Sequence, residues 1–190
     1  MTGVHPDQSP MVKKHSFLNL YVPLLLGLAL TNCASDAPLI LAFPEDADPI
    51  ETMHEAADLL QAREEHPAGR VMVQHLLVGV GYAFGNRLPI DAEKRAAKIL
   101  QELAAANGTN FSDLVVKYTD DENPGIYTMT VLDDANSMAD VYSRKHMVPA
   151  FGNTAWRLRV GEFGIALFDP PPPAGKGTSK FGIHIIKRLQ

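Results

Sequence analysis

Short aliphatic runs that alternate with polar residues predict several β-strands, and two of these runs carry a histidine. Residues 181–189 read FGIHIIKRL and follow a loop rich in Gly, Pro and Ser, which is typical of a strand. Apolar residues on both of its faces indicate a central place in a sheet, and alternation puts His184 on the face of Ile186. Residues 71–80 read VMVQHLLVGV and place His75 in the same setting. An unpaired buried imidazole costs about 1–3 kcal/mol, so we expect the two strands to be neighbours that share one polar spot.

Apolar residues at helical spacing predict the helices. The first helix is expected over residues 49–65, ending before His66-Pro67, and the pattern leaves open whether it packs on the domain. A second runs from Asp91 to a stop at Asn107-Gly108, and a third follows with Asn110 as its N-cap. That third helix covers residues 111–118, and the remaining elements are strands at 126–132 and 163–168 and a short helical piece within 143–157.

The first 33 residues have the pattern of an export signal. Lys13 and Lys14 precede an apolar run of about 14 residues, too short to span a bilayer comfortably but suited to a signal peptide that starts at Met1 or Met11. The run ends at LTNCAS, which resembles a bacterial lipoprotein lipobox in which Cys33 would be acylated, although Asn32 departs from the usual small residue. A secretory signal cut after this point and an uncleaved anchor are the alternatives. All three predict a body outside the cytoplasm.

Length, charge and cysteine content restrict the remaining possibilities. A chain of 190 residues holds one good core. The net charge is −5 and no cluster of Lys and Arg with interleaved aromatic residues occurs, so nucleic acid is not an expected partner. A single cysteine excludes disulfide frameworks and cysteine-based metal sites. We predict a leader and signal peptide at 1–33, a tether and linker helix at 34–69, and a folded domain at 70–190.

The order in which four stretches follow one another along that domain is informative. They are QHLLV at 74–78, YTDD at 118–121, a segment from Tyr142 to Trp156, and FGIHII at 181–186. In this order they resemble the parvulin-type peptidyl-prolyl cis/trans isomerases over about residues 70–190. The resemblance implies an α+β fold with a four-stranded antiparallel sheet flanked by helices. Residues 124–140 and 169–179 are longer than the family pattern, which leaves room for a shallower or partly filled pocket.

The resemblance also implies a set of site residues. Met147 and Phe151 would grip the proline ring, with Tyr142 nearby and Ala139 where the family tends to have a leucine. The catalytic group implied comprises His75, His184, Asp121 and Ser179. Asp121 would lie beside the substrate carbonyl, and Ser179 would hold one imidazole in its tautomer. Read without the family, the histidines are core residues, Met147 and Phe151 are the core face of a helix, and Asp121 is a turn residue.

Three functions from different classes remain open. The first is a prolyl isomerase that assists the folding of exported proteins, works without metal or cofactor, and is lipid-anchored in the cell envelope facing the periplasm or secreted in soluble form. The second is a binding or chaperone module for extended proline-containing chains that has lost turnover. The third is an envelope lipoprotein that uses the fold only as a scaffold. Arg87 is the only basic residue in the loop after the first strand, so no phosphate-binding cluster is expected.

Overall fold

The computed structural model describes residues 42–133 and 140–190. Every described residue belongs to one compact unit, Cys33–Gln190. The predictions made for the signal peptide, Cys33 and Ala139 therefore lie outside the described residues. None of the helices in the described ranges is both long and apolar enough to cross a bilayer.

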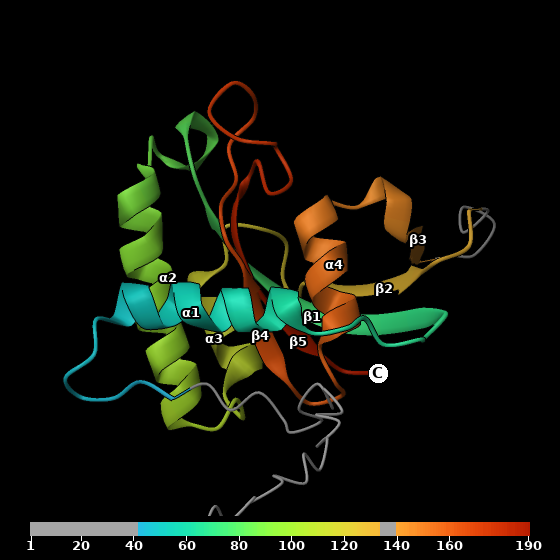
Figure 1. Ribbon diagram of the computed structural model, residues 1–190, viewed down its shortest axis with the longest axis horizontal. Coiled ribbons are helices and arrows are strands. Elements are labelled where there is room, and N and C mark those ends of the chain that lie inside the picture. The colour runs from blue at the N-terminus through green and yellow to red at the C-terminus, as the bar shows by residue number, and fades with distance from the viewer. Residues whose placement is uncertain (1–41, 134–139) are drawn as a thin grey trace, which may run out of the picture. The chain divides into compact units, whose positions relative to one another are not determined.

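Five strands form one mixed sheet in the order β3-β2-β1-β5-β4 (Figure 1). They are β1 Arg70–Gly79, β2 Ile126–Thr130, β3 Val141–Ser143, β4 Phe163–Ala166 and β5 Gly182–Arg188. Every neighbouring pair is antiparallel except β2 and β3, which run parallel. The prediction of four antiparallel strands is therefore wrong by one strand. β3 escaped prediction because three residues are too few to show an alternating pattern.

The expected pairing of the two histidine strands is confirmed. β1 lies between β2 and β5 at the centre of the sheet, and β5 lies between β1 and β4. In the antiparallel register His75 is opposite Ile186, and Leu77 is opposite His184. Residues directly opposite each other share a face, so both imidazoles project from the same side of the sheet as diagonal neighbours.

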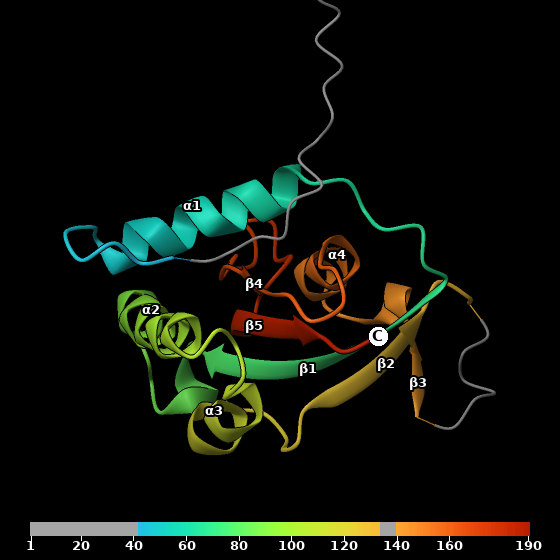
Figure 2. The same ribbon diagram turned by 90° about the horizontal axis from the view of Figure 1, so that it is seen from below.

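Helices cover both faces of this sheet (Figures 1 and 2). α2 and α3 pack on one face, against a core that includes Leu76 and Ile185, and α4 packs on the other, against Val73 and Ile186. The helices are α1 Pro49–Ala62, α2 Pro89–Ala105, α3 Phe111–Tyr118 and α4 Pro149–Arg157, with 3-10 turns η1 Tyr82–Phe84 and η3 Arg144–His146.

The ends of α2 and α3 show one success and one error of prediction. α2 stops as expected, because Asn107 and Gly108 both take positive φ angles, 48° and 70°. Asn110 precedes α3 but makes no side-chain cap. Its amide instead donates to the carbonyl of Glu102, so the asparagine ties the start of α3 to the end of α2.

α1 is part of the packed domain, which answers the question that its sequence left open. Asp48 caps its start, accepting a hydrogen bond of 2.7 Å from the Ile50 amide. Met53 and Leu60 are fully buried, the first in the core beneath α2 and the second against β4. A Cβ at Gly164 would lie 2.5 Å from Leu60 Cδ2, so the missing side chain lets α1 approach β4 closely.

Candidate active site

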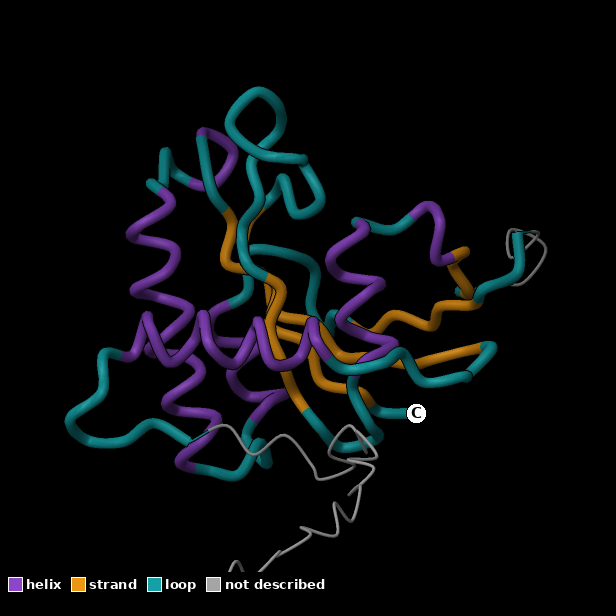
Figure 3. Tube along the Cα trace, in the orientation of Figure 1, coloured by secondary structure: helices purple, strands orange, loops and turns teal. Residues whose placement is uncertain are grey.

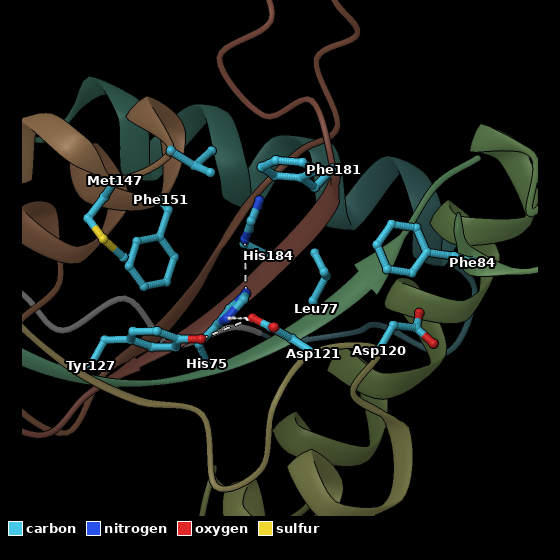
Figure 4. Close-up of a pocket in the computed structure, with 11 residues that line it drawn as sticks. His75, Leu77, Phe84, Asp120, Asp121, Tyr127, Met147, Phe151, Phe181 and His184 are labelled. Carbon is cyan, nitrogen blue, oxygen red and sulfur yellow. Dashed lines mark hydrogen bonds and ion pairs between the residues drawn. The ribbon is translucent and has the colours of Figure 1, made fainter. Parts of the chain in front are cut away.

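A cavity of about 300 Å³ opens on the face of the sheet that α4 covers (Figure 4). His75, Leu77 and His184 of its lining place it near the end of β1 and the beginning of β5. Figure 3 shows two loops that leave this end of the sheet. Its lining consists of His75, Leu77, Phe84, Asp120, Asp121, Tyr127, Met147, Val148, Phe151, Phe181 and His184. Most of these side chains are apolar, and the polar ones gather on the floor.

The floor carries the two histidines in direct contact. His184 Nδ1 lies 2.9 Å from His75 Nε2, and both side chains are only 3% exposed. The two rings are stacked with centroids 4.9 Å apart, and the edge of Phe151 meets the His75 ring at 5.0 Å. The expected shared polar spot is therefore present, enclosed by apolar side chains.

The turn that carries Asp121 is held against β1 by backbone hydrogen bonds. The Asp120 amide donates to the Leu77 carbonyl at 2.9 Å, and the His75 amide donates to the Gly125 carbonyl at 2.8 Å. Gly125 has φ 66°, and a Cβ there would lie 2.4 Å from the His75 carbonyl oxygen, so only glycine fits. These bonds fix Asp121 beside the His75 ring.

A polar network runs from Tyr127 through Asp121 to the imidazole pair (Figure 4). The Tyr127 hydroxyl donates to Asp121 Oδ2 at 3.1 Å, and the same oxygen lies 3.4 Å from His75 Nδ1. A carboxylate facing Nδ1 favours the proton on that nitrogen, so we assign His75 Nε2 as the acceptor and His184 Nδ1 as the donor. His184 Nε2 is then an acceptor with no hydrogen-bond partner among the described residues.

The protonation states of the network follow from burial and neighbours. Contact with the His75 ring, opposed by burial and aided by the Glu122 amide and the Tyr127 hydroxyl, lowers the pKa of Asp121 to about 2. Burial lowers the pKa of both His75 and His184. Burial and the nearby Asp121 raise the pKa of Tyr127. At neutral pH the floor therefore holds one carboxylate, two neutral imidazoles and a neutral phenol.

One end of the cavity is an apolar recess built around α4. Phe151 lies in the first turn of this helix and Met147 and Val148 immediately precede it, and the Tyr127 ring meets Phe151 edge-on at 5.7 Å. η3 sets the position of Met147, whose amide donates to the Arg144 carbonyl at 3.1 Å. Met147 and Phe151, which the sequence placed together, both line the cavity.

Two other predicted site residues lie elsewhere. The Ser179 hydroxyl is fully buried and donates to the Gly182 carbonyl at 2.7 Å, so it holds the start of β5 and not an imidazole. Tyr142 is 47% exposed and is not among the residues that line the cavity, although its ring lies 5.9 Å from that of Tyr127. Both residues were implied by the family resemblance, which does not show where a side chain points in this chain.

Several lining residues were not predicted. Leu77 had a usable signal, since it lies two residues after His75 on the same strand face. Phe84 and Phe181 had none, because their places depend on how loops fold over the sheet. Tyr127 lies on β2, and its place depends on the pairing of β2 with β1, which was not predicted. Asp120 was not predicted, because the family resemblance indicated its neighbour Asp121. Within the residues that the structure describes, no group of three or more His, Cys, Asp or Glu side chains could hold a metal ion.

No protein-family model matches the chain, and no curated protein matches it in sequence. Among solved structures it is similar to the peptidyl-prolyl isomerase ESS1 from Candida albicans, with a TM-score of 0.44 and 18% identity over 77% of this chain and 79% of that one. It is also similar to the solution structure of TbPIN1, with a TM-score of 0.41 and 21% identity over 65% of this chain and 99% of that one. Both are distant likenesses in structure, at 18% and 21% identity.

Proposed function

We propose that this protein is a peptidyl-prolyl cis/trans isomerase. The observation that carries the proposal is the apolar recess of Met147, Val148 and Phe151 set directly beside the ionised carboxylate of Asp121. A proline ring is a compact apolar group, and the amide attached to it is polar. The pocket offers adjacent surfaces of both kinds.

The reaction requires rotation about a bond and no bond cleavage. Amide resonance sets an uncatalysed barrier of about 18–20 kcal/mol for rotation about the bond that precedes proline. A catalyst must bind the twisted amide more tightly than either planar form. Packing the ring in the recess would hold one side of the bond while the other side turns.

Asp121 supplies the electrostatic part of the mechanism. In a planar amide, resonance places negative charge on the carbonyl oxygen, and twisting removes part of it. A carboxylate beside that oxygen repels the planar form more than the twisted one, which lowers the barrier. Because both imidazoles are neutral, they orient Asp121 and leave its charge uncompensated.

The cellular role belongs to the same proposal. The signal-like pattern of residues 1–33 supports a chain that is exported, lipid-anchored through Cys33 in the cell envelope, and acts on unfolded proline-containing polypeptides there. A Cys33→Ser variant of the full-length chain should lose incorporation of a labelled fatty acid. Equal labelling of both chains would contradict the anchor and favour a secreted or otherwise retained protein.

Two-dimensional exchange NMR on an Ala-X-Pro peptide tests the activity. The full-length chain should accelerate isomer exchange well above the spontaneous rate of about 0.01–0.1 s⁻¹. Asp121→Ala and Met147→Ala should remove the acceleration, whereas Val116→Ala, at a side chain 68% exposed on α3, should keep it. Peptide binding without faster exchange would show a binding module instead. A folded chain that neither binds nor accelerates would sink both functions.

A further inference from the structure

We propose that Glu65, in the segment between α1 and β1, is a positioning residue for the apolar recess. It acts through Arg144, which it holds against α4, and Arg144 in turn fixes Met147. This inference rests on the proposed isomerase function and adds a positioning group from the stretch that the sequence predicted as a linker. That segment passes beside the end of α4, where the His66 amide donates to the Trp156 carbonyl at 2.8 Å (Figures 1 and 2).

The Glu65 carboxylate binds an arginine from each side of α4. Its two oxygens accept hydrogen bonds of 2.6 and 2.7 Å from Arg144, which is a bidentate pair. Oε1 also accepts a hydrogen bond of 2.8 Å from Arg157. Arg144 begins η3, ahead of the helix, and Arg157 is the last residue of α4. One carboxylate therefore connects the residues that precede α4 to the end of that helix.

Glu65 is charged at neutral pH and partly shielded from solvent. The hydrogen bond from Arg144 holds the pKa of Glu65 below its usual value, against the opposing effect of partial burial. The side chains of Glu65, Arg144 and Arg157 are between 19% and 34% exposed. Solvent ions therefore screen these pairs less than they screen a pair on the open surface.

Arg144 also makes its own contacts with α4, and these give it one defined orientation. Its Nη2 donates to Asn153 Oδ1 at 2.8 Å, and the guanidinium lies over the Trp156 ring at 4.6 Å. A Cβ at Gly152 would lie 3.2 Å from Arg144 Cγ, so the glycine lets the stem of the arginine lie close to the helix. Glu65 supplies the negative charge that completes this site.

Met147 depends on Arg144 because it borders open space in two places. It lines the cavity that holds the histidines. It also lines a separate hollow of about 320 Å³, to which Arg144, Lys145 and Pro149 contribute. Packing around Met147 is therefore incomplete, and its amide is tied to the Arg144 carbonyl by a hydrogen bond of 3.1 Å. Release of Arg144 would let Met147 shift towards the hollow and widen the recess.

The expected kinetic signature follows from what the recess does. It contacts the proline ring in the planar and the twisted amide alike, so a looser recess weakens both states equally. Loss of such uniform binding raises KM and leaves kcat unchanged. Asp121 is held by separate contacts with His75 and Tyr127, so the electrostatic part of the mechanism should persist.

Glu65→Gln in the full-length chain tests the inference, with Glu64→Gln as the matched control. Glu64 is the preceding residue, is exposed, and loses the same charge. In exchange NMR over a range of concentrations of Ala-Ala-Ala-Pro-Ala, Glu65→Gln should raise KM about fivefold and keep kcat within about twofold. Glu64→Gln should match the parent chain. Arg144→Lys keeps the positive charge but loses the bidentate pair, so it should raise KM as well, and it keeps the test available if Glu65→Gln does not fold.

Methionine methyl resonances give a second readout that does not depend on activity. The Met147 methyl signal should shift in Glu65→Gln, whereas that of Met53, buried beneath α2, should stay in place. The double variant of Glu65→Gln with Arg144→Lys should raise KM no further than Arg144→Lys alone, because Glu65 acts through Arg144.

The outcomes separate this inference from the proposed function. An unchanged KM in a folded Glu65→Gln chain, or a fall in kcat at constant KM, would overturn the positioning role and leave the isomerase standing. Equal effects of Glu64→Gln and Glu65→Gln would also overturn it, since they would show a general effect of charge. If the parent chain binds the peptide without accelerating exchange, the isomerase fails. Weaker peptide binding by Glu65→Gln, but not by Glu64→Gln, would then still support the positioning role.

Discussion

Single replacements of the paired imidazoles should cost more stability in sum than the double replacement. We consider His75→Leu, His184→Leu and the variant that carries both. The two rings share one hydrogen bond of 2.9 Å at 3% exposure. Removing one ring leaves a buried nitrogen of the other without its partner, and removing both leaves no such nitrogen.

The magnitudes follow from the contacts of each ring. A neutral hydrogen bond contributes about 1 kcal/mol net, and an orphaned buried polar atom costs about 1–3 kcal/mol. His184→Leu leaves His75 Nε2 without its hydrogen-bond partner, which destabilises the fold. The same change removes His184 Nε2, a buried atom that has no partner in the described structure, so the net loss in the free energy of unfolding should be about 1 kcal/mol. His75→Leu orphans His184 and removes the imidazole beside Asp121, so we expect about 2–3 kcal/mol. The coupling energy should be about 1–2 kcal/mol.

Urea denaturation followed by tryptophan fluorescence measures these values. Trp156 is the only tryptophan, is 2% exposed, and donates from Nε1 to the Ala68 carbonyl at 2.8 Å, so its emission reports on the packed state. The four chains form a double-mutant cycle. Additivity of the single effects to within about 0.5 kcal/mol would refute the claim that the imidazoles satisfy each other.

Three further predictions concern the turn, acid stability and α1. Gly125→Ala should destabilise the fold by about 2–4 kcal/mol in urea, because of its positive φ and the clash with the His75 carbonyl; an unchanged midpoint would contradict the described turn. The lowered pKa of Asp121 should stabilise the folded state by up to about 1 kcal/mol above pH 4, a value reduced because the side chain is one-third exposed. This stabilisation should be lost as the pH falls towards about 2. Asp121→Asn should flatten that part of the acid titration of stability, and a parallel curve would argue against it. Met53→Ala should cost about 2–4 kcal/mol while Leu59→Ala, 63% exposed, costs little, and equal effects would mean that α1 does not join the core.

The sequence was a good guide wherever a long run of residues repeats one period. The aliphatic runs around His75 and His184 predicted two strands, their adjacency and their common face, because burial on both sides of a strand demands such runs. The stripe of α2 and the stop at Gly108 were predictable for the same reason.

The sequence was a poor guide where the contacts of a side chain depend on how a turn or a helix end folds. Phe84 lines the cavity because Gly79 leaves room for its ring, a relation that no local pattern shows. Asn110 had the right residue type for a cap, but the nearby Glu102 carbonyl takes its amide. Ser179 was implied by the family resemblance as the partner of an imidazole, but its hydroxyl donates to the Gly182 carbonyl. In each case the path of the backbone around the residue selected the contact, and the residue type alone did not.

The place of α1 beside β4 bears on how this sheet avoids pairing with other chains at its edges. A bare sheet edge presents unpaired amides and carbonyls, and it invites any extended strand to add itself and aggregate. At one border of this sheet α1 approaches β4 closely at Gly164, and at the other border β3 has only three residues. Neither edge strand is a long, open template, so the sheet offers little backbone to which another extended chain could add.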